Sequence, residues 1–328
     1  MRYVVGLVVL ALAVCGSAYW WAIAEPLHLP ASGYAFDVKP GATLRSVARD
    51  LTAAGVLPAD WTLVALARAT RADRNIKAGN YAIDSRTTLA RLLAKLTQGD
   101  VTQSSLAVVE GWTFRELKEA LRNDDKIVKR SIDLPDAELM KSIGANESAP
   151  EGLFFPDTYF FSAGSTDTAL LARAYRTMRQ RLAAAWAARA PDLPLDDPYQ
   201  ALTLASIVEK ETGRAADRPL VAAVFINRLK LGMRLQTDPT VIYGIGEGFD
   251  GKLKKGDLEK DRPFNTYVHA GLPPTPIALP GQASIDAVLH PPAVQYLYFV
   301  ARGDGSSEFS TTIAEHNRAV AKYQRAGR

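Results

Sequence analysis

The start of the chain restricts the topology of everything that follows, because it contains a long stretch without a charged side chain. Tyr3 to Ala24 is 22 residues long, with Arg2 before it and Glu25 after it. At ~1.5 Å per residue a helix of this length spans roughly 33 Å, enough to cross the hydrocarbon core of a bilayer. The stretch predicts a transmembrane helix, with the rest of the chain on one side of the membrane.

Two features favour a retained anchor over a cleaved signal peptide, which is the alternative. A signal peptide usually has a shorter apolar region and a small-x-small exit site, whereas Tyr19, Trp20 and Trp21 are residue types found where a helix leaves the membrane.

The orientation follows from the basic residue at the start of the chain. Arg2 lies on the short N-terminal side of the apolar stretch, so the positive-inside tendency places the N-terminus in the cytoplasm. The remaining residues are then expected outside the cytoplasm.

Composition narrows how the exported part is held together and what it binds. The one cysteine, Cys15, lies in the apolar stretch, so the rest has no disulfide and depends on its core, for which 48% hydrophobic residues suffice. The net charge is +4, but the basic residues alternate with acids and no basic run carries spaced aromatics. This pattern indicates a solvated surface and no nucleic-acid partner.

A small mixed domain is expected after a linker at residues 25–33. Residues 34–38 alternate as a strand does, and Thr43 can cap a helix that ends near Gly55. The apolar positions that fall at helical spacing are Leu44, Val47, Ala48 and Leu51. Continuing to a second strand near residues 76–83, this segment resembles a LysM domain, a βααβ module that binds N-acetylglucosamine chains. A plain structural β-α unit is the alternative.

The same unit recurs along the chain. VKPGATLRSVARDL at residues 38–51 matches VVEGWTFRELKEAL at residues 108–121, with a weaker echo at residues 87–96. The shared parts predict a strand, a glycine turn and an amphipathic helix capped by threonine.

Larger elements follow. Residues 123–150 are polar and predict a connection or a helical insert. EGLFFPDTYFF at residues 151–161 is aromatic but interrupted by Pro-Asp, which disfavours a regular helix or central strand. A long amphipathic helix is expected at residues 168–190, and the next helix contains ASIVEKETG, residues 205–213.

That helix carries two acids on different faces. On a helical wheel Glu211 lies about 60° from the centre of the apolar face and Glu209 about 100° from it. Glu211 is therefore the carboxylate whose surroundings raise a pKa, which lets an acid keep its proton at neutral pH. Glu209 is expected to be solvated or paired, for example with Arg214 or Lys210. An ordinary surface role at a helix end is the alternative for Glu211.

Two further segments can present polar side chains to a cleft. Gln236, Thr237 and Asp238 precede a proline, and Asn265, Thr266 and Tyr267 precede a proline-rich segment at residues 273–280. Stiff loops with aromatic and amide side chains suit a groove for a sugar polymer. An ordinary irregular surface is the alternative.

Other chemistries are disfavoured. The four histidines have no metal-ligand spacing, and the chain has no G-x-S-x-G elbow, phosphate loop or dinucleotide fingerprint. We therefore expect neither a metal nor a cofactor. His316 is interpreted as structural.

Four phrases together resemble a known family: LASIVEKETG, VFINRLKLGMRLQTDPTVIYG, FNTYVHAGLPPTPIALPG and YLYFVARGDGSSEFSTTIAEHN. They are similar to the YceG-like family, the endolytic murein transglycosylases of bacterial inner membranes, over nearly the whole chain. The resemblance implies an α+β fold. Residues 1–26 would form a cytoplasmic tip and anchor, residues 27–105 a linker and LysM-like subdomain, and residues 106–328 the YceG-like catalytic domain, with a connecting segment at residues 123–150.

The resemblance also implies an activity. Members of the family cut nascent glycan strands between N-acetylmuramic acid and N-acetylglucosamine, leave 1,6-anhydro ends and so terminate strand elongation. The family's catalytic residue is the second glutamate of E-K-E-T, here Glu211, acting as general acid and then general base. The substrate-binding positions that match the family's motifs are Gln236, Thr237, Tyr243, Asn265 and Tyr267.

One acid suffices for that reaction, because the muramyl C6 hydroxyl replaces water as nucleophile. A hydrolytic muramidase would need a second carboxylate, for which Asp157, Asp238 and Glu209 are candidates. The family's location implies a single-pass inner-membrane protein with a periplasmic catalytic part, glycan strands as substrate and peptidoglycan synthases (penicillin-binding proteins) as partners. The alternatives are a hydrolytic muramidase and a non-catalytic adaptor that binds the cell wall.

Overall fold

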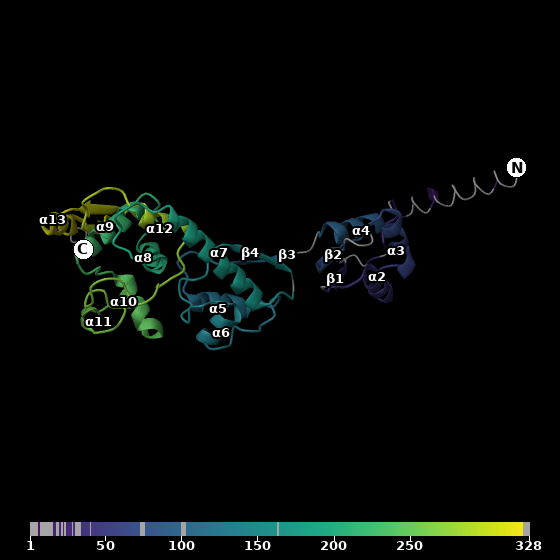
Figure 1. Ribbon diagram of the computed structural model, residues 1–328, viewed down its shortest axis with the longest axis horizontal. Coiled ribbons are helices and arrows are strands. Elements are labelled where there is room, and N and C mark those ends of the chain that lie inside the picture. Colours follow the sequence, from purple (N-terminus) through teal and green to yellow (C-terminus); the bar gives the residue numbers. More distant parts are fainter. Residues whose placement is uncertain are drawn as a thin grey trace. The chain divides into compact units, whose positions relative to one another are not determined.

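The chain forms two compact units (Figure 1). The computed structural model describes residues 34–39, 41–72, 76–99, 103–162 and 164–323, together with positions 6, 16, 17, 20, 22, 24–27 and 29. One unit comprises Met1–Ser105 with Phe160–Gly164, and the other comprises Leu106–Tyr159 with Ser165–Arg328. Within the described residues both consist of helices with small two-stranded sheets, so the predicted α+β character is confirmed.

The first unit has a β-α-α-β order followed by one more helix. Its elements are β1 (Tyr34–Val38), α2 (Leu44–Ala53), α3 (Asp60–Ala69), β2 (Gly79–Ile83) and α4 (Leu89–Gln98). β1 and β2 pair antiparallel, with Tyr34 opposite Ile83, and the helices bury their leucines in a core of their own. The LysM identity of this unit stays a prediction.

Threonine caps account for where the helices of the repeated motif begin. Thr43 and Thr88 precede α2 and α4, and Thr113 precedes α5 (Phe114–Asn123) of the second unit. Each hydroxyl accepts the backbone N–H of the residue three positions on. Such a cap satisfies a donor that the first turn leaves unpaired and is worth ~1 kcal/mol. The repeated strand-turn-helix motif predicted from the sequence is confirmed at this level.

No helix in the described part of the chain is long and apolar enough to cross a membrane. The predicted anchor at residues 3–24 falls largely on positions outside the described residues.

The second unit contains most of the helices. Its elements are β3 (Gln103–Ala107), α5 (Phe114–Asn123), α6 (Asp136–Ser142), β4 (Thr158–Ser162), α7 (Asp167–Ala187), α8 (Pro198–Glu211), α9 (Arg218–Lys230), α10 (Asp238–Ile245), η1 (Gly246–Gly248), α11 (Lys255–Glu259), α12 (Gln282–Leu289), β5 (Tyr298–Ala301), β6 (Ser307–Ser310) and α13 (Ile313–Tyr323). The division between the units passes through the β3–β4 pair.

Helix α8 is the centre of this unit (Figure 1). Asp197 accepts the N–H of Gln200 and Pro198 occupies the first turn, which fixes the helix start. Every residue from position 201 to 208 is buried, because α7, α9, α10 and α12 pack around it. The helix ends at Glu211, where the next residue is extended.

Two expected elements differ in their bounds. The helix predicted at residues 168–190 is α7, which ends at Ala187. The aromatic segment 151–161 is irregular in its first half, and its second half belongs to β4, which begins after Pro-Asp and lies in a two-stranded sheet, so it is not a central strand. The insert at residues 123–150 contains α6.

Candidate active site

Glu211, the last residue of α8, is a half-buried carboxyl whose pKa is raised to about 7. Burial is the main cause, since a charged carboxylate loses hydration there. A hydrogen bond from the Thr237 hydroxyl to Oε1 lowers the pKa, the negative charge of Asp238 raises it and the Arg228 guanidinium lowers it. The raised pKa lets this carboxyl keep its proton near neutral pH.

Thr237 is held rigidly for this contact. Only 2% of it is exposed, and its N–H donates to the Thr266 hydroxyl at 3.1 Å. Thr240 donates to the Thr237 carbonyl at 2.8 Å and lies 2.9 Å from the Thr266 hydroxyl. Two buried threonines, Thr240 and Thr266, thus fix the donor to Glu211, and Thr240 is one that the sequence analysis did not identify.

Gln236 makes the turn that presents Thr237. Its φ is 51°, in the left-handed region that non-glycine residues rarely adopt, and its N–H donates to the Thr266 carbonyl at 3.1 Å. Strained backbone of this kind persists where the surrounding structure demands it. The Gln236 side chain is exposed.

Asp238 and Tyr267 complete the cluster. The Tyr267 hydroxyl donates to Asp238 Oδ1 at 2.6 Å, and the pKa of Tyr267 is raised by burial and by its hydrogen bond to Asp238. Of the three candidate second acids, Asp238 is the one whose charge acts on Glu211. Asp157 lies exposed next to β4 and accepts the N–H of its neighbour Thr158.

Glu209 is paired, but the partners expected for it are wrong. Only 7% of its side chain is exposed, and Oε1 lies 3.6 Å from the guanidinium of Arg218 on α9. Oε2 accepts the Gly281 N–H at 2.9 Å and the Ser284 hydroxyl at 2.7 Å, both at the start of α12. Lys210 instead donates to the Gly111 carbonyl. The wheel cannot show this arrangement, because its partners come from two distant helices.

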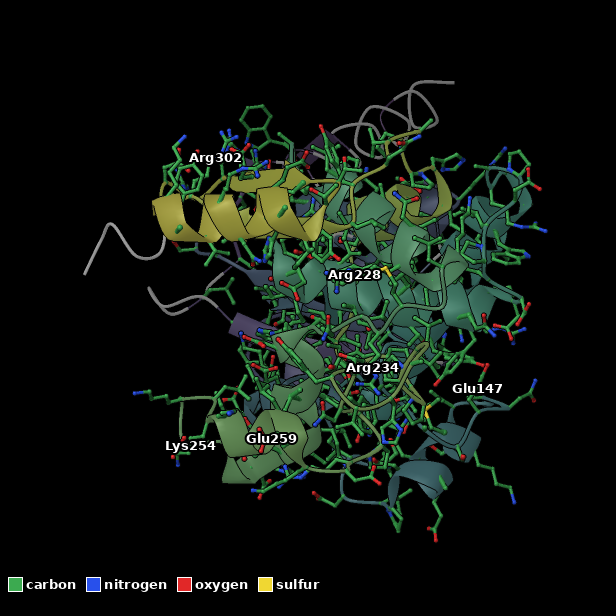
Figure 2. The ribbon with its side chains drawn as sticks, turned by 90° about the vertical axis from the view of Figure 1, so that its left-hand side faces the viewer. Glu147, Arg228, Arg234, Lys254, Glu259 and Arg302 are labelled. Carbon is green, nitrogen blue, oxygen red and sulfur yellow. The ribbon has the colours of Figure 1, made fainter. Side chains whose placement is uncertain are left out.

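Arg228 is a site residue that the sequence analysis missed. Figure 2 shows it in the interior of the molecule, whereas Lys254 and Glu259 lie at the outside. It is 8% exposed, and its guanidinium donates to the carbonyls of Leu235 and Leu297 at 2.9 and 2.7 Å. Burial lowers its pKa. A lone arginine in the apolar run VAAVFINRL was the available signal.

The other two predicted cleft residues have contacts elsewhere. Asn265 is 1% exposed, and its Nδ2 donates to the carbonyls of Asp257, Leu258 and Lys260, which ties down the α11 loop. The Tyr243 hydroxyl donates to Glu151 Oε2 at 3.1 Å. The structure therefore brings Thr237 and Tyr267 to Glu211. Gln236 is the backbone neighbour of Thr237, whereas Asn265 and Tyr243 make their polar contacts elsewhere.

Within the described residues no group of three or more His, Cys, Asp or Glu side chains is arranged to hold a metal ion. A proton-transfer site built on Glu211 is the chemistry that the arrangement offers.

Comparisons with known proteins agree on one family. The model of the YceG-like family matches residues 36–322. The endolytic murein transglycosylase of Bacillus subtilis (strain 168) is 34% identical over 264 residues, which is 75% of this chain and 73% of that protein. The endolytic murein transglycosylase of Streptococcus pneumoniae serotype 2 (strain D39) is 26% identical over 284 residues, 76% of this chain and about half, 51%, of that protein.

A crystal structure of a yceG-like protein from Listeria monocytogenes is also similar. Its TM-score is 0.53 and its sequence identity 26%, and the alignment covers 87% of this chain and 98% of that one. That protein therefore shares the fold of this chain as well as part of its sequence.

Proposed function

The chain belongs to the YceG-like family, and we propose that it is a lytic transglycosylase that cleaves peptidoglycan glycan strands with Glu211 as the catalytic residue. The names of its curated relatives support the enzyme class, which is the one that the sequence predicts. The cleaved bond is proposed to be the one between N-acetylmuramic acid and N-acetylglucosamine of nascent strands. The products then carry 1,6-anhydro ends, and strand elongation stops.

The observation that carries this proposal is the state of Glu211. A general acid works best when its pKa lies near the working pH, and burial raises the pKa of this carboxyl to about 7. Thr237 orients the carboxyl through Oε1, which leaves Oε2 for the substrate.

In the first step, protonated Glu211 donates its proton to the glycosidic oxygen as the bond to the muramyl C1 breaks. The positive charge that develops at C1 is stabilised by the negative groups nearby, the newly formed Glu211 carboxylate and Asp238. The leaving sugar departs with a new C4 hydroxyl group.

In the second step, the Glu211 carboxylate takes the proton from the muramyl C6 hydroxyl, whose oxygen bonds to C1 and closes the anhydro ring. Glu211 is again protonated, so the cycle needs neither water nor a cofactor. Among the predicted cleft residues, Gln236 and Tyr267 are proposed to hold the sugar at this point.

The location and partners are part of the proposal. Residues 3–24 form an uncharged stretch of membrane-spanning length, which supports a single-pass anchor in the bacterial inner membrane with the catalytic unit in the periplasm. Synthases of the penicillin-binding type are the proposed neighbours, and the small unit is proposed to bind N-acetylglucosamine chains. Protease accessibility in spheroplasts tests the topology, and protection of residues 34–323 would contradict it.

One observation favours a second candidate, a hydrolytic muramidase. Asp238 acts electrostatically on Glu211, and a pair of carboxylates is what a hydrolytic glycosidase uses. The products differ by one water, since an anhydro end lacks the water that hydrolysis adds.

Product analysis on purified glycan strands decides between these activities. We expect anhydro-muropeptides from the wild type, and none from Glu211→Gln, which keeps the Thr237 hydrogen bond but has no acidic proton. Arg302→Gln, on the exposed hairpin β5–β6, is the matched control and should cut normally. Reducing ends of ordinary muramic acid would favour the muramidase, and normal cutting by Glu211→Gln would refute the role of this residue.

A further inference from the structure

A second polar cluster lies at the other end of the two helices that build the site. Glu211 ends α8 and Asp238 begins α10, whereas Tyr199 lies in the first turn of α8 and Tyr243 near the end of α10. The end of α8 meets the start of α10 where Thr237 contacts Glu211, and Tyr199 and Tyr243 lie close enough to act on each other electrostatically. Tyr243 lies roughly 7.5 Å along the helix axis from Asp238.

Glu151 is the buried acid of this cluster. It is 6% exposed, its Oε1 and Oε2 lie 2.9 and 3.2 Å from the Phe114 nitrogen, and Oε2 also accepts the Tyr243 hydroxyl at 3.1 Å. No ion pair to Glu151 is found in the part of the chain that the structure describes. A carboxylate that is buried without a cation lowers the stability of the fold. Its presence here therefore indicates a functional role for Glu151.

Capping of α5 explains only part of this arrangement. Thr113 and Glu116 already form a capping box at that helix, and the Phe114 N–H requires a single acceptor atom. The second partner of Glu151 is a tyrosine whose ring is half-buried and rests edge-on against Phe264, with ring centroids 4.9 Å apart. Fixing the Tyr243 hydroxyl is therefore a separate task of the same carboxylate.

We propose that Glu151 is a positioning residue: it fixes Tyr243, and Tyr243 together with Tyr199 contacts the glycan strand at a sugar adjacent to the one cleaved at Glu211. The inference rests on the proposed function, because it assigns a second subsite for the same polymer. A tyrosine ring packs on the CH face of a sugar. The Tyr243 hydroxyl donates to Glu151 and interacts with the Thr275 hydroxyl, and its second lone pair can accept a hydrogen bond from a sugar hydroxyl.

The electrostatics give this subsite a pH dependence of its own. Burial raises the pKa of Glu151 to about 7, and the Phe114 and Gly152 N–H groups, Tyr243 on α10 and Glu116 on α5 act on it. Tyr199 on α8 also interacts with its charge. An ionised carboxylate accepts the Tyr243 hydroxyl more strongly than a neutral one. Strand binding should therefore weaken below pH 7, whereas acid catalysis by Glu211 weakens above it.

The test is steady-state cleavage of uncross-linked glycan strands by the full chain. We expect Glu151→Gln and Tyr243→Phe each to raise KM about threefold to tenfold with kcat nearly unchanged, and the double variant to match Tyr243→Phe. Tyr175→Phe removes a hydroxyl that donates to a different acid, Glu147, at 2.6 Å, and should leave KM unchanged. Unchanged KM, a loss confined to kcat, or additive effects would overturn the proposal.

A binding measurement separates this inference from the proposed function. Strand binding is compared between Glu211→Gln alone and the same variant carrying Tyr243→Phe, at pH 6 and pH 8. Weaker binding with Tyr243→Phe, and a smaller pH effect, supports the subsite even if the wild type makes no anhydro ends. Equal binding at both pH values overturns the subsite even if the wild type is an active transglycosylase. Because these variants keep Glu151, a folding defect of Glu151→Gln leaves the test intact.

Discussion

At the scale of the residue, the chemistry of Glu211 depends on its pKa, which neighbouring groups shift in opposite directions. Burial and the Asp238 charge favour the protonated carboxyl, whereas the Thr237 hydroxyl and the Arg228 guanidinium favour the ionised form. The proposed role of general acid needs the first pair, and the proposed role of the carboxylate that receives the C6 proton needs the second. A pKa of about 7 allows both roles in one catalytic cycle.

Removing the charge of Asp238 should move the pH profile. Asp238→Asn leaves Glu211 without a neighbouring negative charge, so its pKa falls and the alkaline limb of kcat/KM shifts to lower pH by on the order of 0.5–1 unit at low salt. The rates of product release across pH 5–9 measure the shift. A profile that moves to higher pH would contradict the assigned sign.

Glu211 should also cost stability when ionised. The folded pKa of about 7 lies above the unfolded value of 4.5, so the folded state binds more protons between these values and stability falls as pH rises from about 4.5 to 7. Glu211→Gln removes this loss. The change in unfolding free energy that the substitution causes is therefore expected to be about 1–3 kcal/mol more favourable at pH 8 than at pH 4.5. Urea unfolding at the two pH values checks this, and an equal effect at both would contradict it.

At the scale of the element, buried carboxylates join segments that are distant in sequence. Asp167, at the start of α7, is fully buried and accepts the backbone N–H groups of Arg130, Ser131 and Ile132 at 2.7–2.9 Å. Burial raises its pKa, but the N–H donors outweigh burial and the pKa is lowered overall. This carboxylate thereby orders the otherwise irregular chain between α5 and α6.

Asp167→Asn should loosen that segment. An amide has one acceptor oxygen, and its nitrogen only donates. We therefore expect the variant to lose about 2–3 kcal/mol of unfolding free energy at pH 7. Because the folded pKa is lowered, the stability that Asp167 contributes is present above the unfolded pKa and is lost as pH falls through the folded one. The variant should therefore lose less stability than the wild type between pH 5 and pH 2. Asp133→Asn, at an exposed ion pair, is the control and should cost little.

Glu209 ties α8, α9 and α12 together. Glu209→Ala leaves the Arg218 guanidinium and the start of α12 without their acceptor, at a cost of about 2–4 kcal/mol. Since Glu209 makes its contacts away from Glu211, kcat per folded molecule should be nearly unchanged. A large loss of kcat with full folding would assign Glu209 to the catalytic machinery instead.

At the scale of the whole molecule, each compact unit has its own buried core. The side chains of the proposed active site, including Glu211, Thr237, Asp238 and Tyr267, all belong to the larger unit. A chain that begins at residue 103 keeps β3 for pairing with β4, so it should fold and release anhydro ends from soluble strands at a rate close to that of the full chain. Circular dichroism and product analysis check this, and a folded but inactive fragment would show that the small unit is needed for catalysis.

Local sequence patterns predicted much of the helical structure and the main candidate acid. The apolar periodicity and threonine caps located α2, α4 and α5, and the wheel of α8 selected Glu211 as the acid with the raised pKa. The rules failed where partners come from elsewhere in the chain. Arg218 and Ser284 around Glu209, Arg228 beside Glu211 and the pairing of Glu151 with Tyr243 lie 9 to 92 positions from the residues they serve.

The phrase ASIVEKETG shows the division between the two sources of information. Helical geometry is local, so residue spacing alone places Glu209 and Glu211 on different faces of α8, with Glu211 nearer the apolar face. Burial and hydrogen bonding depend on segments that meet only after folding. Only the tertiary structure therefore shows that Thr237, Asp238 and Arg228 act on the pKa of Glu211. It also shows that Glu209 contacts α9 and α12 and so links them to α8.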